Sequence, residues 1–399
     1  TAFNTSTRAF TGEALNPGFF QQLDQDVAYL NSRGITSGLV LAWAEIPNSS
    51  EFDYRSFPSE QARLRYAEYI AARYSADNVY FVVAGEWQKS LSASAYNSLG
   101  QVLAAADPHG RLVTIHNWQE TPSSFGKEDW AGFGEYRQLY SRLHENVLNI
   151  RATYPDKPAV ASEYAYFLRD QSHNGHPDKP NSGTIEDIRH ATWDIAMAGA
   201  YFVTGFGSTY YGGMRHPTPF NGDVRDVAWE MQVQHVRELF TSLPWWSLKP
   251  ADELISAATA LGAPIARSAA DVPANSTRPL HQSERTFWAL ADVGRTYVGY
   301  FRGIDGVINI SLGDVPSSTY KLQLFNPRTG EFQVLDFDTV NGAIVVASPD
   351  TQDWVIVAIV VPEPSSLVLL AAWGFLVSGR RMRQYKCRRN RAANIRTTK

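Results

Sequence analysis

Short apolar runs alternate with longer amphipathic segments through the first 250 residues of the chain. Ile35–Trp43 is nearly continuous in apolar residues, as expected for a parallel strand covered on both faces. The segment before it starts at Asn16-Pro17, with proline in the first turn of a predicted helix, and Gly34 ends that helix. Further strands are predicted at Asn78–Gly85, Arg111–His116, Pro158–Glu163 and Ala200–Phe206, with a weaker one near Trp130–Tyr136; helices are predicted at Ser59–Tyr74, Ala93–Ala106, Tyr136–Thr153, Thr184–Ala198 and Val224–Ser242.

This alternation predicts an α/β fold with a parallel sheet, and repeated strand-helix units favour a (β/α)8-type barrel. A closed barrel of this type needs eight strands, whereas the sequence offers five clear ones and one weak one. We therefore expect residues 1–250 to form a barrel that is N-terminally truncated and lacks its first two strands. An open parallel sheet is the alternative.

The pattern changes after Pro250, where short apolar runs are separated by Gly, Asp, Asn and Pro. Such spacing is typical of an antiparallel β-sandwich, which we expect over residues 251–360. Ala257–Asn275 is predicted to be a linker or an edge. The expected strands are Phe287–Leu290, Tyr297–Phe301, Val307–Leu312, Tyr320–Phe325, Phe332–Phe337, Ala343–Ala347 and Trp354–Val360.

Charge and cysteine content exclude several classes of function. Nine of the 36 Lys and Arg residues lie in residues 380–399, so the rest of the chain is acidic and has no basic stripe for nucleic acid. The one cysteine, Cys387, lies in the basic tail, so residues 1–379 have no disulfide framework, no thiolate zinc site and no cysteine nucleophile. The chain also lacks a Gly-rich phosphate loop before a helix, and we predict no cofactor and no metal.

Residues 361–399 form a separate pattern. Val361-Pro362-Glu363-Pro364 precedes the apolar run Leu367–Val377, which is shorter than the ~20 residues that span a bilayer. Arginines follow this run. The arrangement resembles the PEP-CTERM sorting signal of exported bacterial proteins. That resemblance implies export, transient membrane anchoring, processing by an exosortase-type sorting enzyme, and a final location at the cell surface or in the extracellular matrix. A buried terminal strand is the alternative interpretation.

Two carboxylates follow predicted strands, and chemistry in a parallel barrel lies at those carboxyl ends. Glu86 follows the strand Asn78–Gly85, and Glu163 ends the strand Pro158–Glu163. Hydrolysis of a glycosidic bond needs one acid to protonate the leaving oxygen and a second carboxylate opposite it. A solvated loop is the usual position for a single Glu after a strand. Two glutamates that each end a buried apolar segment favour a catalytic pair, because burying a charge that has no function costs free energy.

Aromatic and polar side chains lie near the other predicted strand ends, where flat rings can stack on sugars. For each ring alone, packing in the core is an equal alternative. A group after Glu163 (Asp170, His173, His176 and Asp178) is more consistent with a solvated loop than with a metal site. The predicted substrate-binding residues are Trp43, Glu45, His116, Asn117, Trp118, Tyr166, Tyr210 and Tyr211.

Short motifs in a fixed order mark the chain between about residues 10 and 360. They are Leu15-Asn16-Pro17, Gly34-Ile35, Ala71-Ala72-Arg73-Tyr74, Asn78-Val79, Gly85-Glu86, Pro158 to Tyr164, Leu243-Pro244-Trp245 and Leu248-Lys249-Pro250. With these motifs the chain resembles the apiosidase-like glycoside hydrolases. The resemblance implies a (β/α)8 catalytic barrel followed by a small β-domain of the kind named collagen-binding. By position it implies Glu86 as the acid/base and Glu163 as the nucleophile or second carboxylate.

The expected function is hydrolysis of glycosidic bonds in a polysaccharide or oligosaccharide by an exported enzyme. Two alternatives remain open from the sequence. One is a non-catalytic surface protein that binds polysaccharide. The other is an endo-acting barrel hydrolase of the cellulase or mannanase kind.

Overall fold

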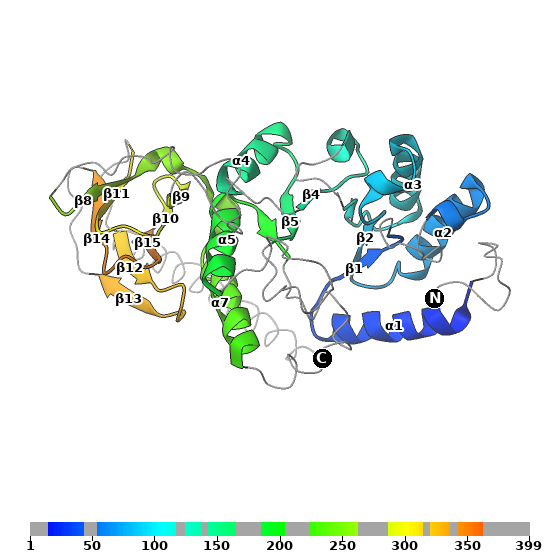
Figure 1. Ribbon diagram of the computed structural model, residues 1–399, viewed down its shortest axis with the longest axis horizontal. Helices are drawn as coiled ribbons and strands as arrows, with labels where there is room; N and C mark the ends of the chain where they lie inside the picture. The colour runs from blue at the N-terminus through cyan, green and yellow to red at the C-terminus, as the bar shows by residue number, and fades with distance from the viewer. Residues whose placement is uncertain are drawn as a thin grey trace, which may run out of the picture.

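The computed structural model describes residues 15–43, 54–116, 124–137, 143–164, 185–203, 224–261, 286–313, 320–335 and 342–361. Parallel strands with covering helices make up the first part, and antiparallel sheets make up the second. In Figure 1 the antiparallel sheets lie at one end of the molecule, and α5 and α7 stand between them and the parallel strands. The segment 362–399, which includes the predicted sorting signal, lies outside the described residues.

Six parallel strands form two three-stranded sheets, in the orders β1-β2-β3 and β4-β5-β6. The chain between Ala131 and Gly134 connects them: Ala131 bridges to Val113 in parallel, and Gly134 donates its N–H to Pro158 O at 2.9 Å. The strands therefore follow one another in chain order, as in a barrel. They are β1 (Ser37–Val40), β2 (Val79–Val82), β3 (Val113–Thr114), β4 (Gly134–Arg137), β5 (Ala159–Glu163) and β6 (Tyr201–Phe202).

Helices follow these strands and begin where the sequence supplies caps. Asn16 accepts hydrogen bonds from the N–H groups of Gly18 and Phe19, and Pro17 fills the first turn of the first helix. Ser59 and Ser92 cap the next two helices in the same way. The helices are α1 (Pro17–Ser32), α2 (Glu60–Arg73), α3 (Ala93–Ala106), α4 (Leu143–Thr153), α5 (Ile185–Met197) and α7 (Val224–Thr241).

One predicted boundary is wrong. The sequence predicted a helix from Tyr136, whereas Tyr136 lies inside β4 and the helix begins at Leu143. Tyr136 is buried in the cluster that α4 and α5 form against the sheet, and its neighbour Glu135 points to the other face. This alternation is that of a strand, and the parallel pairing of β4 with β5 stabilises it. The weak strand predicted near Trp130–Tyr136 is therefore present.

The β domain, which we define as the strands from Lys249 to Val360, is an antiparallel sandwich. A six-stranded sheet has the order β13-β12-β15-β10-β9-β7, and a three-stranded sheet has the order β14-β11-β8. Apolar side chains from both sheets form the core between them. The strands are β7 (Lys249–Pro250), β8 (Ile255–Thr259), β9 (Phe287–Asp292), β10 (Thr296–Phe301), β11 (Gly306–Ser311), β12 (Tyr320–Phe325), β13 (Phe332–Leu335), β14 (Ala343–Ala347) and β15 (Trp354–Val360).

The outer face of the six-stranded sheet packs on α5 and α7. Trp193 of α5 stacks on Tyr300 of β10 with ring centroids 5.2 Å apart and planes 5° apart. Arg302 forms a buried ion pair with Asp194, with N–O distances of 2.5 and 2.9 Å. Apolar residues of both parts surround these contacts in one continuous cluster. The barrel and the β domain therefore share a core.

Among the described helices, none has the length and apolar content that a membrane span requires.

Candidate active site

The carboxyl ends of the parallel strands carry the candidate site. Trp43, which follows β1, forms a parallel bridge with Gly85, which follows β2. Tyr54 donates its hydroxyl to Val83 O at 2.9 Å, and Tyr66 donates to Leu41 O at 3.3 Å. Both phenols are buried, and burial raises their pKa. These bonds occupy backbone carbonyls just before the site and hold the ends of the first two strands in place.

Glu86 has the most unusual backbone of the described part of the chain. Its φ of 47° and ψ of 45° are left-handed, and it is the one described residue other than glycine with a positive φ. The residue is fully buried, at 0% exposure. Both a left-handed glutamate and a buried carboxylate are costly, and such costs concentrate at functional sites. The strained turn therefore marks Glu86 as the centre of the candidate site.

Gly85 allows this turn to lie against an aromatic ring. A Cβ atom at Gly85 would lie 2.0 Å from the indole ring of Trp43, well inside van der Waals contact. Only glycine fits there without movement of the ring. On the other side, Trp87 packs edge-on against Phe125 at 4.9 Å between centroids. The backbone on both sides of Glu86 is thus held by indole rings.

His116 connects the strand that leads to Glu86 with the strand that ends in Glu163. Its backbone N–H donates to Ala84 O at 2.9 Å, two residues before Glu86. Its ring Nδ1 lies 3.0 Å from Ser162 Oγ, and Ser162 directly precedes Glu163. The same ring tilts against Trp43, with centroids 5.2 Å apart. The predicted residues Trp43 and His116 therefore lie together beside the turn that carries Glu86.

Glu135 is a buried carboxylate of this site that the sequence analysis missed. It belongs to β4, is 5% exposed, and its Oε2 lies 3.0 Å from His116 Nδ1. Tyr80 of β2 lies nearby: burial first, and then the charge of Glu135, raise the pKa of this phenol. The sequence did contain a signal for Glu135: it is a charged residue inside a predicted strand. Side chains alternate along a strand, so Glu135 and the buried Tyr136 point to opposite faces of the sheet.

Glu163 is the last residue of β5 and pairs with Arg137 of β4, after a shift in register between Tyr136 and Arg137. Its backbone places it at the same edge of the sheet as Glu86. Tyr164 after it is buried, and its hydroxyl lies 2.8 Å from Thr192 Oγ1 of α5. The side chain of Glu163 and the predicted residues Glu45, Asn117, Trp118, Tyr166, Tyr210 and Tyr211 lie outside what the structure describes.

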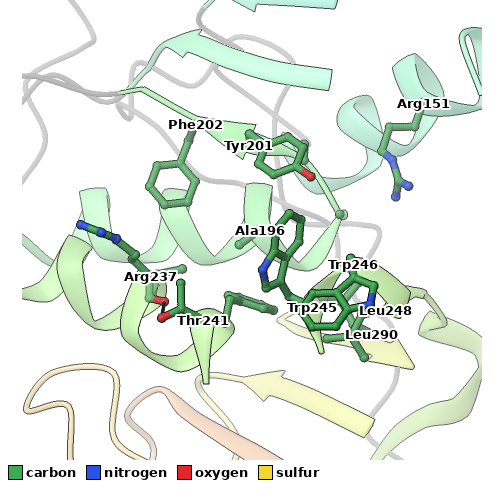
Figure 2. A pocket seen from close by; sticks show the side chains of 14 residues that line it. Arg151, Ala196, Tyr201, Phe202, Arg237, Thr241, Trp245, Trp246, Leu248 and Leu290 are labelled. Atoms are coloured by element: carbon green, nitrogen blue, oxygen red, sulfur yellow. Dashed lines mark hydrogen bonds between the residues drawn. The ribbon is translucent and has the colours of Figure 1, made fainter. Parts of the chain in front are cut away.

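A cavity of about 490 Å³ lies elsewhere, at the start of β6 (Figure 2). Gly199 and Ala200, which precede β6, line it together with rings from the segment after α7. Because the strands are parallel, this is the end of the sheet opposite to Glu86. Among the residues that line it, Tyr201 packs edge-on against Trp245, which in turn packs against Trp246 (Figure 2). Of the predicted site residues whose side chains the structure describes, Trp43, Glu86 and His116 do not line this cavity.

Within the described ranges, no three His, Cys, Asp or Glu side chains are grouped as a metal would require.

Comparison with known families identifies the first part of the chain. Residues 2–247 match the family described as "Apiosidase-like, catalytic domain". The chain belongs to this apiosidase-like family. It is therefore a glycosidase, and its parallel strands and helices form the catalytic domain. Among curated protein sequences there is no match.

Solved structures share the fold of both parts. A glycoside hydrolase family 5 protein from Bacteroides vulgatus ATCC 8482 superposes with a TM-score of 0.67 at 17% identity, covering 90% of this chain and 78% of its own. A second structure, described as a glycoside hydrolase, gives 0.64 at 15% identity and covers 90% of this chain and 80% of its own. At these identities the likeness shows the fold, which is an α/β barrel with a β domain.

Proposed function

We propose that this apiosidase-like enzyme cleaves O-glycosidic bonds of a polysaccharide or oligosaccharide, with Glu86 and Glu163 as the reacting carboxylates. Glu86 donates a proton to the leaving oxygen, and Glu163 acts from the opposite side of the sugar ring. The observation that carries the proposal is the fully buried, left-handed Glu86 at the carboxyl end of β2.

The surroundings of Glu86 suit a general acid. Its side chain is fully buried beside Trp87, and burial in general disfavours the ionised form of a carboxyl group, which is the form that a general acid must avoid before it reacts. The strained backbone fixes the direction of the side chain before substrate binds, which lowers the cost of reaching the transition state. Trp43, beside the same turn, is partly exposed and is the described aromatic residue that we expect to contact the sugar.

The position of Glu163 suits the second carboxylate. Its strand lies at the same edge of the sheet, and its neighbour Ser162 contacts the ring of His116. His116 in turn is bonded to the strand of Glu86. If the two carboxyl groups are ~5 Å apart, the anomeric configuration is retained; a gap of about 6.5–9.5 Å admits a water and leads to inversion. Proton NMR of the first product distinguishes these outcomes.

Substitution of each carboxylate tests the assignment. Glu86→Gln and Glu163→Gln are each expected to lower kcat on aryl glycosides and natural glycans by about a thousandfold or more, because each removes a group that acts in the transition state. Glu68→Gln, on the exposed face of α2, is the matched control and should keep full activity. Activity that survives in Glu86→Gln contradicts the assignment.

Two further measurements distinguish the alternative functions. Glycan-binding and hydrolysis assays test the first: a protein that only binds polysaccharide would still bind the glycan after either substitution and would show no hydrolysis before or after it. Product analysis tests the second: an endo-acting enzyme of the cellulase or mannanase kind would release internal fragments, whereas an enzyme that removes terminal sugars releases monosaccharides.

We also propose export to the cell surface or extracellular matrix through the segment from Val361 onward. The support is its sequence: Pro362-Glu363-Pro364, an apolar run, then arginines. This order implies transient membrane anchoring and recognition by an exosortase-type sorting enzyme. In a bacterial host with such an enzyme, the native chain should reach the surface or medium, and a variant with Ala at positions 362–364 should remain in the membrane fraction.

A further inference from the structure

Three side chains from three successive strands meet behind the turn that carries Glu86. His116 follows β3, Glu135 lies on β4, and Ser162 lies on β5. His116 Nδ1 is 3.0 Å from both Glu135 Oε2 and Ser162 Oγ. The contact is enclosed, since His116 is 6% exposed and Glu135 is 5% exposed.

The hydrogen-bonding capacity of these atoms determines where the His116 proton lies. An ionised carboxylate can only accept, so Glu135 requires a proton on Nδ1. Ser162 directs its own hydroxyl toward Tyr136 O at 3.4 Å, which leaves its oxygen to accept as well. Both neighbours therefore favour the same tautomer, with Nδ1 protonated. In the neutral ring, Nε2 is then an acceptor.

The network also fixes the plane of the ring. Bonds at one nitrogen to two different strands restrict its rotation, and the indole of Trp43 packs against its face. Among the described residues, His116 after β3 and Tyr80 of β2 lie close to Glu135. His116 is thus a hydrogen-bond partner of the buried Glu135 carboxyl group.

We infer that Glu135 is a positioning residue of the glycosidase, which holds His116 in one orientation and one tautomer beside the turn that carries Glu86. The inference rests on the proposed function of Glu86 and Glu163, since it places His116 beside the sugar that they cleave. Glu135 acts through His116 and does not itself react with the sugar.

Kinetic measurements on a double-mutant cycle test this role. Glu135→Ala is expected to lower kcat by about a hundredfold with a smaller change in KM, the loss that a displaced active-site group causes. Glu135→Gln, which keeps an acceptor oxygen for Nδ1, should lose only about tenfold. In a His116→Ala background, Glu135→Ala should change kcat by less than about twofold, because the group through which it acts is gone.

A loss of equal size in both backgrounds would overturn the inference. So would recovery of Glu135→Ala activity by azide or formate, which would make Glu135 a reacting carboxylate. If Glu135 had only a structural role, Glu135→Ala would lower the melting temperature and leave kcat per folded molecule unchanged. That result would also contradict the inference. Glu68→Gln is again the control.

Nitrogen NMR of ¹⁵N-histidine-labelled protein tests the same inference without turnover. The His116 signals are assigned by their loss in His116→Ala. Native protein should show a protonated Nδ1 and an unprotonated Nε2, and Glu135→Ala should give a mixture of the two tautomers. Unchanged ring shifts in Glu135→Ala would overturn the inference. The spectrum tests the role of Glu135 without any turnover, whereas the activity of Glu86→Gln tests the proposed function. The two proposals can therefore fail independently.

Discussion

At the scale of single residues, contact between Gly85 and Trp43 controls the position of Glu86. We expect Gly85→Ala to displace the indole ring and the left-handed turn, because the added methyl group would lie 2.0 Å from the ring. Overpacking of this kind costs about 1–3 kcal/mol in the free energy of unfolding. If Glu86 is the acid, as proposed, its displacement is expected to lower kcat by about a hundredfold.

Urea unfolding and aryl glycoside kinetics measure the two effects of Gly85→Ala. Gly18→Ala is the control, since the nearest atom to its added Cβ is 3.5 Å away. A Gly85→Ala variant with native kcat would show that the geometry of the turn does not matter for catalysis.

The sequence predicted the site unevenly at this scale. Glu86 and Glu163 could be proposed from the sequence because each follows an apolar run; in the structure Glu86 follows β2 and Glu163 ends β5, and their catalytic role stays a prediction. The left-handed backbone of Glu86 could not be predicted, since nothing local distinguishes it from an ordinary glutamate. Glu135 was missed because its partner, His116, lies 19 residues away and only the packing of β3 beside β4 joins them.

At the scale of elements, an ion pair attaches α1 to α2. Arg73 donates to both carboxylate oxygens of Asp24, at 2.9 and 2.5 Å. The hydrogen bond from Arg73 is the main reason that the pKa of Asp24 lies below its usual value. Because the folded pKa is lowered, the stabilisation is present above the unfolded pKa of about 3.9 and is lost as pH falls through the folded value.

We therefore predict that Asp24→Asn lowers the free energy of unfolding at neutral pH by less than about 1 kcal/mol, a small effect because both side chains are partly exposed. The difference from the native protein should shrink progressively as the pH falls below the unfolded pKa of about 3.9. Urea unfolding over a series of pH values from neutral into acid measures it. A difference that grows in acid would contradict the assignment.

Helix starts were predictable where a capping residue precedes an amphipathic segment, as at Asn16 and Ser59. The start of α4 was not, because Tyr136 fits either a helix or a strand. Its state is decided by pairing with β5, a contact between segments more than 20 residues apart.

At the scale of the whole molecule, buried charges join the barrel to the β domain. Asp194 of α5 is fully buried and binds Arg302 as well as the indole N–H of Trp288, at 3.0 Å. Arg189 makes a similar buried pair with Asp353, at 2.7 and 3.0 Å. From the sequence, the two parts were identified by strand pattern, but the pairing of charges across them was not visible.

We predict that Asp194→Ala lowers the free energy of unfolding by about 3–5 kcal/mol, because it leaves the Arg302 guanidinium buried without its counter-charge. Thermal and urea unfolding measure the loss. Arg295→Ala removes a pair whose arginine side chain is 77% exposed, and it should have little effect. A native-like Asp194→Ala protein would indicate that the buried pair does not stabilise the interface.

The face of α5 and α7 that a barrel helix usually shows to water is here covered by β9, β10, β12 and β15. If the β domain were cut away near Pro250, Trp193, Met197 and Val236 would be exposed to solvent. A chimaera that carries the β domain into another protein would therefore have to include α5 and α7 as well. The β domain and these two helices accordingly behave as one structural unit.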